Sequence, residues 1–193
     1  MQGMLASFSG LEVEWRRGKV RARHGEWRAM RLGESFWRDL DWWDQQLEHS
    51  NCVPIERPAR AVAAVQAGTD ASDWGTGQVT WWGGGREEHR LIFTVAEKRR
   101  PINWRELLGI VRVALLGGER LRGHVVLIES DNMAAVRAAA KGSSKSEGMQ
   151  ELLRRLLRAA IVHGFRVKVT HTPGAKLDRP DQTSRGDPDP RFK

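Results

Sequence analysis

Four carboxylates occur where separate secondary-structure elements are expected to begin or end. Asp70 follows an apolar run, Glu106 lies near the start of a helical segment, Asp131 closes a second apolar run, and Asp181 lies near the C-terminus. Hard divalent cations prefer oxygen ligands, and carboxylates on different elements can converge on one place. An Asp, Glu, Asp, Asp series of this kind suits two-metal phosphodiester chemistry.

Each of these carboxylates also has a purely structural explanation. Asp70 could be a turn residue, and Glu106 could pair with Asn103 in a helix-capping arrangement. Asp131 could cap the helix that follows it, and Asp181 could be a surface turn residue. Together they favour a cation site, because like charges held close together repel and a bound cation removes that repulsion.

The elements that must position these side chains alternate between strands and helices. Apolar runs and turn residues predict strands over residues 61–67, 75–82, 90–95, 124–130 and 165–170. Helical periodicity predicts helices over residues 103–116, 132–141 and 146–163. Gly83, Gly84 and Gly85 indicate a turn between antiparallel strands. The order predicts an α/β fold with a mixed sheet that is flanked by helices.

An extension precedes this unit. A hairpin is expected from residues 11–15 and 19–22 around Gly18, followed by a helix over residues 35–48. Phe36, Leu40, Trp43 and Leu47 recur at helical spacing, so we expect the helix to pack against something. The predicted divisions are an extension (1–58), a main domain (59–186) and a disordered tail (187–193), with two prolines marking a linker over 51–58.

The composition limits the function classes. The net charge is +8, and residues 1–58 hold nine basic and nine acidic residues, so the whole excess lies in residues 59–193. A strongly basic domain favours a polyanionic partner such as nucleic acid. No stretch of 18 apolar residues and no signal peptide is recognisable, and the single Cys52 excludes an internal disulfide. We therefore expect an intracellular protein, in the cytoplasm or nucleus, without a membrane partner.

Five short motifs occur in a characteristic order along the chain. They are Thr69-Asp70-Ala71-Ser72-Asp73-Trp74-Gly75, Ile102-Asn103-Trp104-Arg105-Glu106-Leu107, Ser130-Asp131-Asn132, Lys141-Gly142-Ser143-Ser144-Lys145-Ser146, and His171-Thr172-Pro173-Gly174 leading to Asp181-Gln182-Thr183-Ser184-Arg185. In this order they resemble the ribonuclease H domain of retroelement reverse transcriptases, most closely the DIRS-type and related tyrosine-recombinase elements. The resemblance covers about residues 60–185. The helix with Asp39-Leu40-Asp41-Trp42-Trp43 resembles the connecting segment before that domain.

The resemblance implies a ribonuclease H-like fold with a five-stranded sheet. It makes Asp70, Glu106, Asp131 and Asp181 the catalytic carboxylates that hold two Mg²⁺ ions, with Mn²⁺ as a substitute. His171 stands where many ribonucleases H carry a histidine that helps product or proton handling. The alternative for His171 is a strand-end histidine that is hydrogen-bonded to backbone.

The resemblance also indicates where nucleic acid would bind. Asn132 either contacts the nucleic-acid backbone or only caps a helix. A group of polar and basic residues precedes a helix N-terminus, which suits a phosphate: Lys141, Ser143, Ser144, Lys145 and Ser146. Capping of that helix by Ser144 or Ser146 is the structural alternative, and both roles can hold at once.

The function expected from these features is metal-dependent cleavage of the RNA strand of RNA–DNA hybrids. The expected partners are a hybrid or another nucleic acid and the polymerase portion of a polyprotein. One alternative is a catalytically silent domain that binds nucleic acid or acts as a scaffold. Another is a transposase or integrase-type DNA nuclease of the same fold, although such enzymes lack the glutamate on the first helix, so Glu106 favours ribonuclease H. A DNA-junction nuclease is a weaker option.

Overall fold

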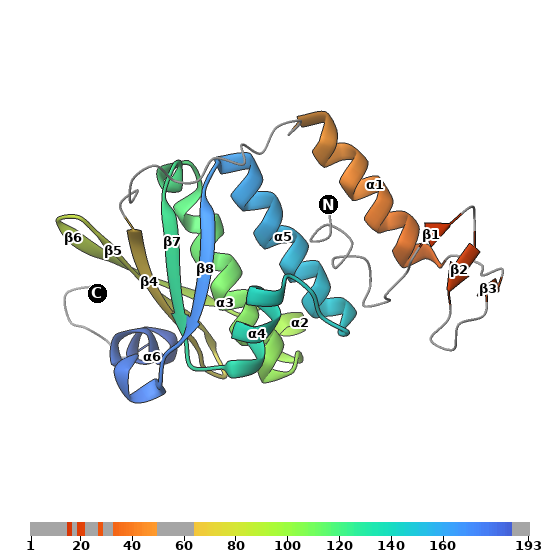
Figure 1. The fold of residues 1–193 in the computed structure, drawn as a ribbon. Coiled ribbons are helices and arrows are strands. Elements are labelled where there is room, and N and C mark those ends of the chain that lie inside the picture. The colour runs from red at the N-terminus through yellow and green to blue at the C-terminus, as the bar shows by residue number, and fades with distance from the viewer. Residues whose placement is uncertain (1–14, 17–18, 22–26, 29–32, 50–63, 187–193) are drawn as a thin grey trace.

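A mixed five-stranded sheet forms the centre of the molecule (Figure 1). The computed structural model describes residues 15–16, 19–21, 27–28, 33–49 and 64–186. The strands of the sheet are β4 (Ala64–Ala71), β5 (Gly75–Trp82), β6 (Gly85–Ile92), β7 (Val125–Ser130) and β8 (Arg166–His171). They lie in the order β6-β5-β4-β7-β8, in which β4, β5 and β6 form an antiparallel meander and β7 and β8 run parallel to β4. The carboxyl ends of β4, β7 and β8 therefore meet at one edge.

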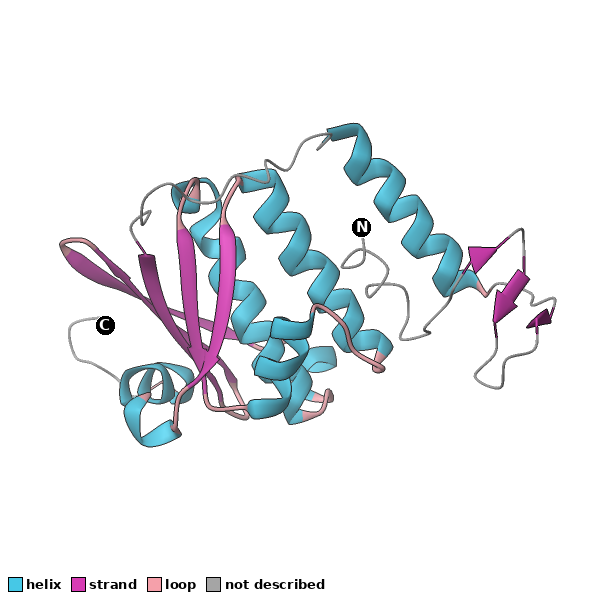
Figure 2. Cartoon of the chain, in the orientation of Figure 1, coloured by secondary structure: helices cyan, strands magenta, loops and turns pink. Residues whose placement is uncertain are grey.

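Helices cover both faces of this sheet. They are α2 (Val95–Lys98), α3 (Ile102–Gly117), α4 (Met133–Lys141), α5 (Glu147–His163) and α6 (Asp178–Arg185), with short 3-10 turns at Gly118–Leu121 and Gly174–Lys176. Figure 2 shows α3 and α5 side by side, with α6 apart from them. Successive strand residues point to opposite faces. Thr69 meets Gly109 of α3, whereas Gly68 meets Pro180 of α6, so α3 and α6 lie on opposite faces.

The apolar core lies between the sheet and the pair of helices α3 and α5. Leu107, Ile110 and Val111 of α3 are fully buried, as are Val126 and Ile128 of β7. Each buried aliphatic side chain of this size contributes roughly 1.5–3 kcal/mol relative to an exposed one. This packing fixes α3 and the strand ends relative to each other.

The helix boundaries follow the capping residues. Ser146 caps α5 by accepting a hydrogen bond from the amide of Met149, and Gly164 ends the helix with φ at 66° in the left-handed region. Asn132 caps α4 in the same way, through the amide of Ala135. The helices predicted over 103–116, 132–141 and 146–163 are thus confirmed to within a residue or two.

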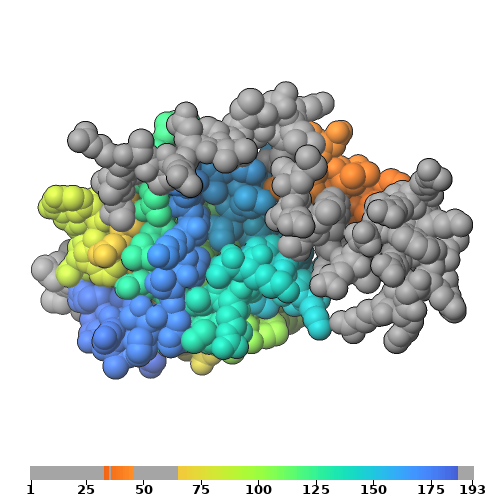
Figure 3. All heavy atoms as spheres, in the orientation of Figure 1, coloured from red at the N-terminus to blue at the C-terminus, as the bar shows by residue number. Residues whose placement is uncertain are grey.

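Two predictions about the main domain are wrong. The third strand begins at Gly85 rather than at residue 90 and ends before Val95, which starts α2. The first part of β6 is charged and lacks the apolar pattern from which a strand is predicted. Because β6 is an edge strand, these charges find partners: Glu87 pairs with Arg120, and Glu88 pairs with Arg179. Asp181 lies within helix α6, so it is not the surface turn residue of its structural explanation. Figure 3 shows this blue C-terminal segment against the yellow-green strands that lie far from it in the sequence.

The extension contains the predicted helix, α1 (Glu34–His49). Two ion pairs join it to α5: Asp39, which is only 2% exposed, pairs with Arg154, and Arg38 pairs with Glu147. Of the predicted apolar stripe, Phe36 and Trp43 are half-buried, whereas Leu40 is 42% exposed.

The first strands form a small sheet of their own. They are β1 (Trp15–Arg16), β2 (Lys19–Arg21) and β3 (Trp27–Arg28), and both pairings are antiparallel. The rest of the predicted hairpin at residues 11–14 and 22, the linker over 51–58 and the tail over 187–193 lie outside the described residues. The division into 1–58, 59–186 and 187–193 stays a prediction. None of the helices in the described ranges is long and apolar enough to cross a membrane.

Candidate metal centre

Three of the four predicted carboxylates converge at the carboxyl edge of the sheet. Asp70 lies near the end of β4, Asp131 follows β7 directly, and Glu106 lies in the second turn of α3. Gly68 is paired with Glu129 in the parallel ladder, which places Asp70 level with Asp131. One carboxylate oxygen from each of the three residues lies within 4.8 Å of the other two.

Glu106 is the most deeply buried member of this carboxylate triad (Asp70, Glu106 and Asp131), at 4% exposure. Its Oε1 accepts a hydrogen bond from the backbone N–H of Ala71 at 3.3 Å. Its Oε2 is buried and has no hydrogen-bond partner in the part of the chain that the structure describes. Burial, and then the charges of Asp70 and Asp131, raise the pKa of Glu106 from 4.5 to about 8.

Asp70 is half-buried, and its Oδ2 accepts a hydrogen bond from the hydroxyl of Ser184 at 2.7 Å. Its pKa is raised, first by burial and then by the charges of Asp131 and Asp181, although the Ser184 hydrogen bond opposes that shift. Without a cation, the triad is a cluster of like charges in which protonation of Glu106 relieves the repulsion.

The donor set fits a divalent cation. Three carboxylates from three separate elements offer oxygen ligands to one place, as hard cations require. The buried Oε2 of Glu106 lacks a donor among the described residues, and an unsatisfied buried polar atom is costly. A cation held by the triad would satisfy this oxygen and offset the repulsion.

Asp181 does not belong to this group of three. It lies on α6, and its Oδ1 accepts a hydrogen bond from Nε of Arg185 at 2.6 Å, in an i,i+4 ion pair. Its charge nevertheless acts on Asp70. The role of Asp181 as a fourth ligand therefore stays a prediction.

Glycines set the approach of α6 to the sheet. A Cβ at Gly77 would lie 2.3 Å from the carbonyl oxygen of Pro180 and 2.4 Å from the amide nitrogen of Ser184. A Cβ at Gly68 would lie 2.9 Å from Cγ of Pro180. Only glycine lets the helix backbone come this close, and that approach is what brings the Ser184 hydroxyl to Asp70.

His171 lies at the end of β8 and is exposed. Its Nε2 is 3.1 Å from the carbonyl oxygen of Asp131. A carbonyl oxygen only accepts, so Nε2 carries the proton in this contact. The geometry is that of a strand-end histidine bonded to backbone, and a role in proton or product handling stays a prediction.

Asn132, which was predicted to contact nucleic acid, follows Asp131 directly and has local partners. Asn132 caps α4 through its Oδ1, and its Nδ2 donates to Oδ1 of Asn103. Asn103 is therefore not the capping partner of Glu106, and α3 has no side-chain cap.

The segment before α5 is partly buried. Ser146 caps α5, Ser144 accepts from the amide of Ser146, and Ser143 is only 7% exposed. Lys141 and Lys145 are exposed. The capping alternative is thus present, and phosphate binding by this segment stays a prediction that depends mainly on the two lysines.

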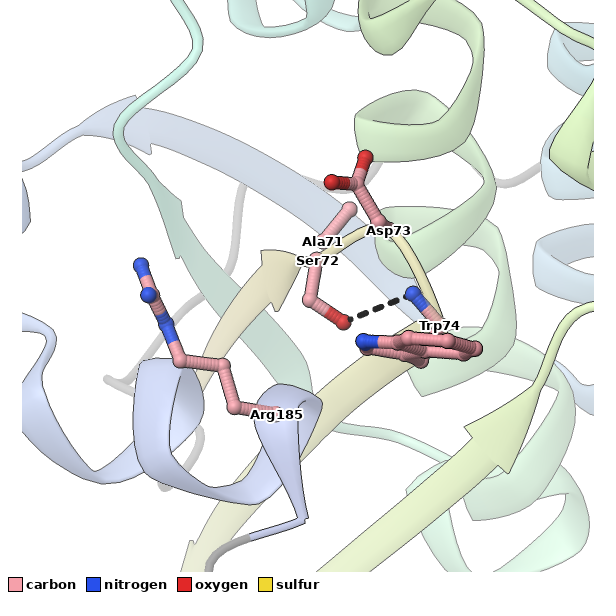
Figure 4. A pocket seen from close by; sticks show the side chains of 5 residues that line it. All are labelled: Ala71, Ser72, Asp73, Trp74 and Arg185. Carbon is pink, nitrogen blue, oxygen red and sulfur yellow. Dashed lines mark hydrogen bonds between the residues drawn. The ribbon is translucent and has the colours of Figure 1, made fainter.

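Two features of the site were missed by the sequence argument. Ser184 positions Asp70, and a pocket beside the triad is lined by Ala71, Ser72, Asp73, Trp74 and Arg185 (Figure 4). Ser184 is part of the last motif, three residues after Asp181, but no helix is predicted there, so no sequence signal singles it out.

The comparisons with known proteins give similarities in structure only. No protein-family model matches this sequence, and no curated protein is similar to it. A structure of RNase H1 from the archaeon Halobacterium salinarum is 16% identical, with a TM-score of 0.49 over 64% of this chain and 96% of that one. A structure of LC11-RNase H1 in complex with an RNA/DNA hybrid is 14% identical, with a TM-score of 0.47 over 67% of this chain and 99% of that one.

A third similar structure is the foamy viral protease-reverse transcriptase in complex with an RNA/DNA hybrid. It is 12% identical, with a TM-score of 0.40 over 81% of this chain and 27% of that one. The topology of the sheet itself, a meander extended by two parallel strands in the order β6-β5-β4-β7-β8, is ribonuclease H-like. The predicted fold class is confirmed: the chain has an α/β fold of the ribonuclease H-like kind, with an acidic group that could bind metal ions.

Proposed function

We propose that this chain is a metal-dependent endonuclease that cleaves the RNA strand of RNA–DNA hybrids. The observation that supports this most directly is the convergence of Asp70, Glu106 and Asp131, with a buried Glu106 oxygen that has no partner among the described residues. Because the sequence motifs resemble those of retroelement ribonuclease H domains, we also propose that the chain derives from, or belongs to, such a reverse transcriptase. A polymerase portion would then be its partner in a polyprotein.

The residues of the site have distinct roles in this proposal. Asp70, Glu106 and Asp131 would hold two Mg²⁺ ions, with Asp181 as the fourth ligand and Mn²⁺ as a substitute. Bound in this way, the ions would supply an activated water and charge neutralisation at the scissile phosphate. Ser184 holds the carboxylate of Asp70 in place, and the Ala71 amide does the same for Glu106. His171 would serve product or proton handling.

The charge distribution supports nucleic-acid binding by the predicted main domain. Residues 59–193 hold 23 basic and 15 acidic residues, whereas residues 1–58 are balanced. A basic surface follows a phosphate backbone, and selectivity for a hybrid comes from contacts with 2′-hydroxyls. Lys141 and Lys145 are exposed candidates for such phosphate contacts.

The test is hydrolysis of an end-labelled RNA–DNA hybrid by the full chain. Cleavage of the RNA strand is expected with Mg²⁺ and not with EDTA, and duplex DNA and duplex RNA of the same sequence should stay intact. Asp70→Asn should abolish cleavage while circular dichroism and melting show a folded protein. Cleavage that persists in Asp70→Asn, or in EDTA, would contradict the proposal.

One observation favours a second candidate, a silent nucleic-acid-binding domain. The carboxylate of Asp181 pairs with Arg185 instead of joining the triad. Mg²⁺ binding by calorimetry separates the two, because a silent domain needs no metal. A chain that binds hybrid with the same affinity in Mg²⁺ and in EDTA, and cleaves nothing, would support this alternative.

A further inference from the structure

A shallow pocket of about 280 Å³ lies next to the carboxylate triad, between the turn after β4 and the end of α6. Figure 4 shows Arg185 on one side of this pocket, Trp74 on the other and Ser72 between them. One of the residues that line the pocket, Ala71, directly follows Asp70 in the sequence. The Ser72 hydroxyl donates to the carbonyl oxygen of Ser184 at 2.8 Å, and Ser184 in turn bonds to Asp70. A molecule in the pocket is therefore beside the triad.

One wall of the pocket is the indole of Trp74, which is 59% exposed. Its backbone is held on both sides: the N–H donates to Oγ of Ser72 at 3.1 Å, and the carbonyl oxygen accepts from the amide of Phe93 at 2.9 Å. These bonds fix the backbone from which the indole projects. Nζ of Lys98 lies 4.6 Å from its ring centroid, so one cation lies over the ring, while more than half of the residue remains exposed and can contact a flat ligand.

The remaining lining adds charge and a hydrogen-bond acceptor. The side chain of Arg185 is 70% exposed, and its Nε is engaged by Asp181. The carboxylate of Asp73 accepts from both terminal nitrogens of Arg105, at 3.2 and 3.3 Å, so its charge is compensated. A flat apolar face, a guanidinium and a compensated carboxylate correspond to the base, phosphate and hydroxyl or amino groups of a nucleotide.

We propose that this Trp74 pocket binds one unpaired nucleotide of the substrate, next to the bond that the triad cleaves. A base inside a duplex has both faces covered by its neighbours, so away from the duplex ends an indole can stack only on a base that is unpaired. The pocket therefore favours hybrids with a single-stranded RNA overhang over blunt hybrids of the same length. This inference rests on the proposed function for its location at the cleaved bond, but the binding preference itself requires no cleavage.

The experiment measures binding by fluorescence anisotropy, with the full chain carrying Asp70→Asn and with EDTA present, so that no RNA is cut. The probes are a labelled RNA–DNA hybrid with blunt ends and the same hybrid with an unpaired RNA extension at either its 5′ or its 3′ end. One of the extended hybrids should bind more tightly than the blunt one. Trp74→Ala should weaken binding of that extended hybrid about tenfold, the scale of one base–aromatic stack, and leave the blunt hybrid unchanged.

Two further variants separate stacking from other effects. Trp74→Phe keeps an aromatic face and should retain most of the preference. Trp37→Ala removes another exposed tryptophan, which is 51% exposed on α1, and should change neither affinity. An equal loss for blunt and extended hybrids in Trp74→Ala, or an equal effect of Trp37→Ala, would overturn the inference.

The outcome for the pocket is independent of the outcome for cleavage. If the wild-type chain cuts hybrids but does not bind extended hybrids more tightly than blunt ones, the proposed nucleotide site at Trp74 is wrong and the proposed function stands. A chain that cuts nothing, yet loses the preference for extended hybrids in Trp74→Ala, would retain the pocket as a nucleotide site and overturn the proposed function.

Discussion

Two helices carry predicted metal ligands from opposite faces of one sheet, and different forces hold them. Helix α3 has 16 residues, of which eight are buried, and seven of those are apolar or glycine. Helix α6 has eight residues, of which only Pro180 and Ser184 are buried. Its contacts with the sheet include the close backbone approach at Gly77, the ion pair of Arg179 with Glu88 at 2.8 Å, and the Ser184 hydrogen bond to Asp70.

This difference shows how the site divides into two parts. The apolar core fixes Glu106, so its carboxylate stays near Asp70 and Asp131 even though their charges repel it. Asp181 depends on a short polar helix, and its carboxylate is paired with an arginine of that helix. Cleavage should therefore be lost when the chemical type of a triad side chain is changed. For α6, cleavage should depend chiefly on how the helix is docked on the sheet.

The largest effect is expected from the carboxylates themselves. Glu106→Gln should reduce hybrid cleavage to the level of the EDTA control, because it removes one of three converging ligands. Asp181→Asn should leave slower but measurable cleavage, because Asp181 lies outside the triad. Single-turnover rates of the two variants at saturating Mg²⁺ provide the comparison. Equal losses would mean that α6 contributes as strict a ligand as α3 does.

The second prediction concerns the pH dependence of stability without metal. The pKa of Glu106 is about 8 in the folded chain against an ordinary value of 4.5, so the folded state binds a proton that the unfolded state has already released. The stabilisation is complete below about pH 4.5 and is lost as the pH rises towards 8, at about 1.4 kcal/mol per pH unit at most.

Denaturant unfolding in EDTA between pH 5 and 8 measures this slope. Glu106→Gln should flatten it, and saturating Mg²⁺ should also reduce it, because a metal-bound carboxylate needs no proton. If the stability of Glu106→Gln depends on pH as steeply as that of the wild type, another group causes the pH dependence. Glu106 would then not be held by α3 in a place that disfavours its charge.

A third, smaller effect tests the docking of α6. Gly77→Ala places a Cβ 2.3 Å from the carbonyl oxygen of Pro180, so the helix must shift away from β5. We expect a destabilisation of about 1–3 kcal/mol, typical of overpacking, together with a marked loss of cleavage. Gly84→Ala is the matched control, because a Cβ there meets nothing within 4 Å. If the two variants behave alike, the close approach of α6 is not needed for the site.

The same difference between the helices explains what the sequence could predict. Strand β5 and helix α5 have clear signals, since residues 75–82 are bounded by glycines and α5 has Ser146 and Gly164 at its ends. The convergence of Asp70 and Asp131 could be expected from two apolar strands of one sheet, each followed by a carboxylate, whereas their register comes from the structure. These parts depend on local pattern and on the core.

The parts that could not be predicted depend on tertiary contacts. Strand β6 carries charged residues such as Glu87 and Glu88, whose partners come from distant segments. Helix α6 has almost no apolar face, and the glycines of β4 and β5 make its docking possible. The pairing of Asp181 with Arg185 needs the i,i+4 spacing of a helix that the sequence does not reveal.

The smallest effect we predict comes from a single hydroxyl that joins the two parts of the site. The Ser184 hydroxyl lies 2.7 Å from Oδ2 of Asp70 and lowers the pKa of that carboxyl against the effect of burial. Ser184→Ala should raise the pKa of Asp70 further, so that its ionised form, which a cation needs, is lost at a higher pH. The acid limb of the rate–pH profile should therefore move upwards, with a loss of stability of about 0.5–1.5 kcal/mol.

Thr183→Ala is the matched control for this hydroxyl, because Thr183 is on the same helix and its Oγ1 bonds to the carbonyl oxygen of Arg179 and to Glu88, away from Asp70. This variant should lose stability but keep the acid limb in place. The profile is measured with labelled hybrid at saturating Mg²⁺, since a shift of the limb reports on Asp70, whereas a uniform fall in rate at every pH reports on helix docking. A uniform fall in Ser184→Ala would mean that α6 serves the triad only by packing, and the two helices would then differ less than their contacts indicate.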